Sequence, residues 1–109
     1  MSSEQFPKNQ VVRLDHSVEY AENSIVSKAV IKSSPGNVTL FAFDKGQELS
    51  EHTAPFDAIV QVLEGTVKIR IAKDEHTMEH GDTIIMPANI PHAVQAVKQF
   101  KMLLTMIRG

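Results

Sequence analysis

The apolar runs of this sequence are short, and most of them end at a residue that favours a turn. The clearest run is 67–71, in which Val and Ile alternate with Lys68 and Arg70. Such alternation is typical of a β-strand with one buried face and one face in water. No segment repeats apolar residues at helical spacing over three turns. The pattern therefore predicts an all-β sandwich or barrel of about eight short strands. The residues that divide the runs are the stretch 33–36, Gly46, Gly65, Gly81 with Asp82, and Pro87.

The composition agrees with a β-rich fold and excludes several functions. The 109 residues suffice for one domain, and Val and Ile together number 20 against 6 Leu, which suits pleated sheets. Without cysteine there is no disulfide framework, no thiolate metal site and no cysteine nucleophile. A net charge of −2 without a basic stripe argues against nucleic-acid binding, and no apolar run is long enough for a membrane span. Residues 1–10 are polar, unlike a signal peptide, so we expect a cytoplasmic protein.

The patterning changes near Ser24. Residues 1–23 have no clear period and predict an N-terminal segment that is partly docked, whereas residues 24–109 predict the barrel domain. Two runs, 84–86 and 102–104, are apolar at consecutive positions, which indicates that both of their faces are covered. We therefore expect a homodimer, with the strand over 24–32 joining the partner's sheet.

Two motifs with regular spacing together span residues 46–96, about half of the chain. The first, GQELSEHTAPFDAIVQVLEG, covers residues 46–65 and contains His52. The second, GDTIIMPANIPHAVQA, covers residues 81–96 and contains His92. Their spacing resembles the two motifs of the cupin superfamily. This resemblance implies a double-stranded β-helix, the jelly-roll barrel of RmlC-like cupins.

The sequence departs from the cupin pattern where metal ligands are expected. Cupins with the full pattern hold one ion with three His and one Glu, or with four His. Here His52 and His92 occupy the first and last ligand positions, whereas Ala54 and Ala58 replace the second His and the Glu, and Asn89 replaces a Gly. Two imidazoles are one ligand short of a usual zinc or non-haem iron site. A divalent ion (Zn, Fe, Mn or Ni) at this pair would need another ligand.

Four residues near the first motif are candidates for that further ligand. Strand alternation points Asp57 and Gln61 away from the lumen unless a bulge intervenes, and Glu48 or Glu51 is the other option. The remaining histidines are weaker candidates, because His76 and His80 border a turn and His16 lies in the poorly patterned N-terminal segment.

Three functions remain open at this point. The first is a small-molecule-binding cupin, whose pocket is lined by His52, Ala54, Ala58, Met86 and His92 and is widened by the two alanines. The second is a metal-dependent enzyme of dioxygenase or isomerase type that acts on a small polar substrate through a metal on His52 and His92. The third is a ligand-free structural or regulatory dimer.

Lys101 interrupts the apolar run of the last expected strand. We expect its ammonium to reach water from the start of that strand, as long cationic side chains commonly do. The alternative is burial, which would make this lysine a base or an anion holder.

Overall fold

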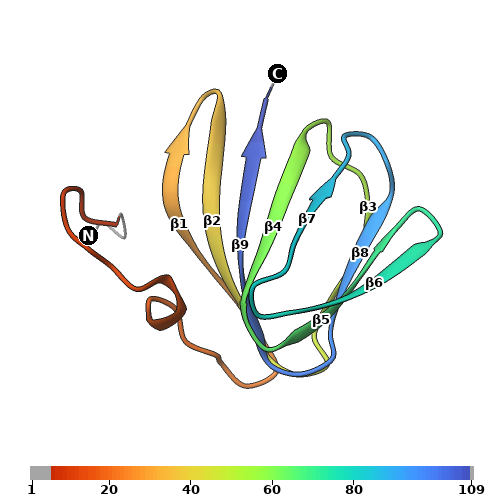
Figure 1. Ribbon diagram of the computed structural model, residues 1–109, viewed down its shortest axis with the longest axis horizontal. Coiled ribbons are helices and arrows are strands. Elements are labelled where there is room, and N and C mark those ends of the chain that lie inside the picture. Colours follow the sequence, from red (N-terminus) through yellow and green to blue (C-terminus); the bar gives the residue numbers. More distant parts are fainter. Residues whose placement is uncertain (1–5, 109) are drawn as a thin grey trace.

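Over residues 6–108, which the computed structural model describes, the chain forms nine strands and one short 3-10 helix (Figure 1). The elements are η1 (Leu14–His16), β1 (Ile25–Ser33), β2 (Gly36–Phe43), β3 (Glu48–His52), β4 (Asp57–Glu64), β5 (Thr66–Ile71), β6 (Asp74–Glu79), β7 (Thr83–Met86), β8 (His92–Ala96) and β9 (Phe100–Ile107). Within the described residues, no helix is both long and apolar enough to cross a membrane.

The strands form two antiparallel sheets that face each other. One sheet has the order β1-β2-β9-β4-β7 and the other has the order β3-β8-β5-β6. Figure 1 shows the sheets close together at the end of β9 that holds Phe100 and splayed apart at the opposite end, where the β3–β4 and β7–β8 loops lie. This arrangement confirms the predicted double-stranded β-helix.

The space between the sheets is filled by apolar side chains. Val67 and Ile69 of β5 are fully buried, so the alternation in this strand does separate a core face from a solvent face. Phe43 and Phe100 pack with ring centroids 4.6 Å apart at the narrow end. Twelve buried residues make up this core: Phe43, Ala58, Val60, Val62, Val67, Ile69, Met78, Met86, Val94, Ala96, Phe100 and Met102.

The N-terminal segment, residues 6–24, lies on the outer face of the five-stranded sheet. Val18 packs there with Leu40 and Ala42 of β2, and Leu14 and Tyr20 pack against the same cluster. These contacts remove from water the apolar side chains on the outer face of the sheet, which point away from the barrel interior.

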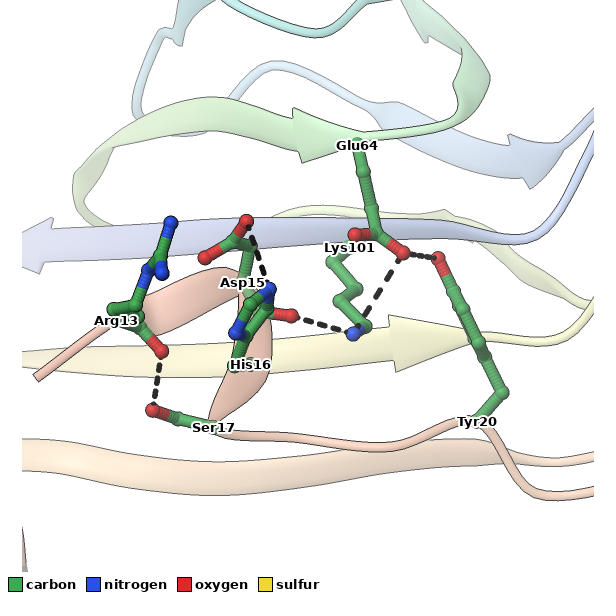
Figure 2. A network of polar contacts seen from close by, with 7 residues as sticks. All are labelled: Arg13, Asp15, His16, Ser17, Tyr20, Glu64 and Lys101. Atoms are coloured by element: carbon green, nitrogen blue, oxygen red, sulfur yellow. Dashed lines mark hydrogen bonds and ion pairs between the residues drawn. The ribbon is translucent and has the colours of Figure 1, made fainter.

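Lys101 at the start of β9 joins this segment to the sheet, and its side chain is buried, with 8% of the residue exposed. Its Nζ donates a hydrogen bond to the carbonyl oxygen of Asp15 (2.6 Å) and lies 3.6 Å from Oε2 of Glu64 (Figure 2). The hydroxyl of Tyr20 donates to the same Glu64 oxygen at 2.6 Å. The expectation that Lys101 reaches water was therefore wrong, because the N-terminal segment covers it and supplies its partners.

Gly65 allows the tight turn between β4 and β5. Its φ of +86° lies in the left-handed region, and a Cβ here would come within 2.6 Å of the Phe100 Cα. Only glycine avoids this contact, which explains why the first motif ends on Gly.

Candidate functional site

His52 and His92 come together at the splayed end of the barrel. His52 is the last residue of β3 and His92 is the first residue of β8, and the two are direct partners in the register of these antiparallel strands. The two motifs therefore meet at one pair of side chains that are 40 residues apart in the sequence.

The two imidazole rings are in contact, and hydrogen bonds hold each one in place. The ring centroids lie 4.3 Å apart with an interplanar angle of 68°. Nδ1 of His52 is 2.7 Å from the Ser50 carbonyl oxygen, and Nδ1 of His92 is 3.2 Å from the Ile90 carbonyl oxygen. A carbonyl oxygen only accepts, so each Nδ1 carries the hydrogen, and each Nε2 of the neutral ring keeps a free lone pair. The site therefore presents two neighbouring acceptor nitrogens.

The two histidines differ in their exposure to water. His52 is exposed, whereas only 6% of His92 is exposed. Burial lowers the pKa of His92, the hydrogen bond to the Ile90 carbonyl opposes this shift, and the neighbouring His52 lowers the pKa further. His92 is accordingly neutral at pH 7.

The apolar part of the predicted pocket consists of Ala54, Ala58 and Met86. Ala58 of β4 and Met86 of β7 are register partners on the five-stranded sheet, and both are buried in the core. Ala54 is half-buried in the β3–β4 loop. The side chains at 54 and 58 are methyl groups, so neither can coordinate a metal.

The described residues do not supply a third metal ligand for the histidine pair. Residues 6–108 contain no group of three or more His, Cys, Asp and Glu side chains suited to one ion. Asp57 and Gln61 are exposed, whereas Ala58 and Val60 are buried, as alternation predicts. Glu51 pairs instead with Arg70 (Nη2 to Oε1, 2.6 Å). The donor set thus falls short of the three-ligand site that a resident catalytic metal of this fold requires.

Two loops flank the histidines, and backbone hydrogen bonds tie them together. The Asn89 N–H donates to the Ala54 carbonyl at 2.7 Å, and the Ala88 N–H donates to Oδ1 of Asp57 at 2.8 Å. Asn89 has a φ of +64°, and asparagine tolerates this left-handed conformation better than most residues. Asn89 occupies the position of the motif's second Gly, and it can therefore adopt the backbone conformation that the loop needs there. Sequence reasoning missed this role, although the motif position was a usable signal.

The other histidines lie away from the pair. His76 is on β6 and His80 follows it, and both are exposed. His16 lies in η1, with Nε2 3.7 Å from Oδ2 of Asp15.

Two antiparallel sheets around an apolar core, with a histidine pair where the sheets separate, define a small β-barrel domain with one polar end. Residues 39–108 match the family model of the cupin domain. This chain belongs to the cupin family.

Solved structures agree with this assignment. A conserved protein of unknown function from Streptococcus pyogenes is 35% identical, with a TM-score of 0.91, over 95% of this chain and 91% of that one. A cupin 2 conserved barrel domain protein from Leptotrichia buccalis is 39% identical, with a TM-score of 0.83, over 86% of this chain and 46% of that one. A cupin superfamily protein from Desulfitobacterium hafniense is 26% identical, with a TM-score of 0.89, over 94% of each chain. No curated protein matches this chain.

Proposed function

We propose that this protein binds a small hydroxylated molecule at the splayed end of the barrel, with His52 and His92 accepting its hydrogen bonds. The observation that carries this proposal is the pair of Nδ1–H···O=C bonds, to the carbonyls of Ser50 and Ile90. These bonds hold both rings in the tautomer that leaves Nε2 as an acceptor.

The spacing of the rings suits a ligand with two donors close together. The centroids are 4.3 Å apart, so two hydroxyl groups on neighbouring carbon atoms, as in sugars and polyols, can each reach one ring. Such a ligand gives the Nε2 of each ring a hydrogen-bond donor. The methyl group of Ala54, two residues after His52 in the β3–β4 loop, is a source of apolar contact for the carbon skeleton.

A metal-dependent reaction of dioxygenase or isomerase type is less favoured. That chemistry needs an ion held by at least three side chains in this fold, and His52 and His92 provide two. Binding a small molecule through hydrogen bonds requires no third side chain beside the two histidines.

The test has two parts. The purified protein is denatured in organic solvent, and the extract is analysed by mass spectrometry for a stoichiometric small molecule. In parallel, the melting temperature is measured against a panel of sugars, polyols and hydroxy acids. We expect the wild type to carry or to be stabilised by a hydroxylated compound, because a ligand that binds only the folded state raises its stability.

The matched variants are His52→Ala and His76→Ala, since both residues are exposed and only the first belongs to the pair. The effect should disappear in His52→Ala and remain in His76→Ala. An empty extract together with no shift from any compound would favour the ligand-free structural or regulatory protein and contradict the proposal.

A further inference from the structure

The side chain of Asn37 on β2 has a buried oxygen atom that lacks a hydrogen-bond partner. Its Oδ1 is enclosed by protein, yet it accepts no hydrogen bond from any of residues 6–108. No other side-chain nitrogen or oxygen of a buried or half-buried residue in this range is in the same situation. An enclosed acceptor without a donor destabilises a fold, so an unpaired one points to a role other than stability.

Alternation along β2 places Asn37 on the inner face of the five-stranded sheet. Phe41 and Phe43 of the same strand pack in the barrel core, whereas Leu40 and Ala42 pack with the N-terminal segment on the outer face. The pairing of β2 with β9 is regular over the whole strand, so this alternation holds back to the start of β2. Asn37 therefore lies on the same face as the two phenylalanines.

Asn37 belongs to a row of inner-face residues that contains part of the predicted pocket. The strand registers align Asn37 with Met106 of β9, Met106 with Ala58 of β4, and Ala58 with Met86 of β7. Asn37 and Met106 are half-buried, whereas the phenylalanines at the narrow end of the barrel are fully buried. The interior is thus accessible at the β2–β9 end of this row.

The histidine pair lies across the opening from this end of the row. The links 44–47, between β2 and β3, and 97–99, between β8 and β9, each cross from one sheet to the other at the narrow end. Strands joined by such short links are neighbours in space, so β2 faces β3 and β9 faces β8. Asn37 is near the start of β2 and His52 is the last residue of β3, so both lie at the splayed end (Figure 1).

The Asn37 oxygen can reach a ligand that lies between the sheets. Its register neighbours on β1 and β9, Lys32 and Met106, leave it unpaired. The terminal torsion of an asparagine side chain is broad, so the amide turns at little cost when a donor is offered. A bound ligand then supplies the hydrogen bond that this oxygen lacks in the free protein.

We propose that Asn37 is a third contact for the ligand of the histidine pair, and that this ligand is a ring-sized polyol such as a monosaccharide or a cyclitol. This inference rests on the proposed function and narrows its ligand class. Packed sheets lie about 10 Å apart, and here they are splayed further, so a two-carbon diol on the histidines does not reach the other sheet (Figure 1).

Each group at the opening has a defined partner on such a ring. Two neighbouring hydroxyl groups donate to Nε2 of His52 and of His92, and a hydroxyl on the opposite edge of the ring donates to Oδ1 of Asn37. Met106, beside Asn37 in the inner row, offers apolar contact to the ring carbons. All three polar groups accept, so the site selects a ligand with several donors.

The experiment measures binding by isothermal titration calorimetry and by the shift in melting temperature. The probes are neutral hexoses, pentoses and inositols, and 1,2-propanediol serves as a diol that is too small to contact both sheets. We expect a cyclic probe to bind the wild type at least about tenfold more tightly than the diol, because it gains a further hydrogen bond and apolar contact.

Asn37→Val separates a binding role from a structural one. We expect about tenfold weaker binding of the cyclic probe, unchanged binding of the diol, and a melting temperature of the free protein that is equal or higher, because valine suits a strand and removes an unpaired acceptor. Asn37→Asp keeps an acceptor oxygen and should retain most of the affinity. Thr77→Val is the matched control on an exposed position of β6 and should change neither quantity. Asn37→Ala replaces the valine variant if that variant does not fold.

The outcomes distinguish this inference from the proposed function. A wild type that binds no cyclic probe, or binding that survives in His52→Ala, would overturn the proposed function and this inference with it. Full affinity for the ring in Asn37→Val, or equal affinity of the wild type for ring and diol, would overturn the role of Asn37 alone. A clear loss of stability in the free valine and alanine variants would show a structural role for the amide and would also overturn it.

Discussion

His52 and His92 touch ring to ring across neighbouring strands, yet one lies in water and the other in the protein interior. Their ring centroids are 4.3 Å apart, His92 is 6% exposed, and His52 is exposed. Because β3 ends at His52 while β8 continues inward from His92, the pair lies at the boundary between solvent and the core. This asymmetry leads to different consequences for stability.

We expect His92→Ala to destabilise the fold and His52→Ala to leave stability almost unchanged. Removing the buried ring leaves a space in the interior, which should lower the free energy of unfolding by about 1–3 kcal/mol. Removing the exposed ring should change it by less than about 0.5 kcal/mol. Urea denaturation of both variants measures this, and equal effects would contradict the unequal burial.

Lys101→Met should destabilise the protein, because the carbonyl of Asp15 and the carboxylate of Glu64 lose their buried cation. The Glu64 side chain is 39% exposed, which weakens the ion pair. We therefore expect the free energy of unfolding to fall by about 1–3 kcal/mol. Lys98→Met is the control, since Lys98 is exposed. Chemical denaturation of the two variants should separate them, and a Lys101 variant as stable as the wild type would show that the network contributes nothing.

Tyr20 should titrate well above the ordinary value of 10.0 for a phenol. Its pKa is raised first by burial and then by the hydrogen bond and the charge of Glu64. It is the only tyrosine in the chain, and there is no tryptophan, so the ultraviolet absorbance of phenolate reports on this residue alone. We expect no phenolate at pH 10 in the folded protein, followed by its appearance as the protein unfolds at higher pH.

The sign of the linked stability change follows from the raised pKa. At and above pH 10 the unfolded chain releases the Tyr20 proton while the folded chain keeps it, so stability falls as pH rises from about 10 toward the folded pKa. Glu64→Gln removes the carboxylate and should lower the titration midpoint, although burial keeps it above the ordinary value. A midpoint near 10 in the wild type would mean that Tyr20 is not held against Glu64.

Gly65→Ala should lower the free energy of unfolding more than Gly46→Ala does, although both glycines have positive φ. The left-handed conformation alone costs an alanine about 1–2 kcal/mol, and this is the full effect expected at Gly46, where an added Cβ meets nothing within 4 Å. At Gly65 the added Cβ also collides with the backbone of Gln99 and Phe100, for a total of about 2–5 kcal/mol. Thermal denaturation compares the two variants, and a similar cost would show that the β4–β5 turn adapts easily.

The spacing of turn residues carried most of the fold prediction. The alternation in β5 and the turn residues Gly46, Gly65 and Gly81 predicted an all-β sandwich or barrel, because each reports a local requirement of the backbone. The resemblance to the cupin motifs then specified the jelly roll. The same reasoning placed Asp57 and Gln61 outside the barrel. The environment of Lys101 could not be predicted, because its partners Asp15 and Glu64 are 86 and 37 positions away in the chain.

The amino-acid sequence alone determined the β-class of this protein, its cupin motifs and the two residues at ligand positions, His52 and His92. These properties depend on period-two alternation and on residue types at fixed spacing, which are visible along the chain. Only the tertiary structure decided that the rings of His52 and His92 meet across neighbouring strands and that the N-terminal segment covers Lys101. Each of these depends on how segments that are far apart in the chain pack in three dimensions.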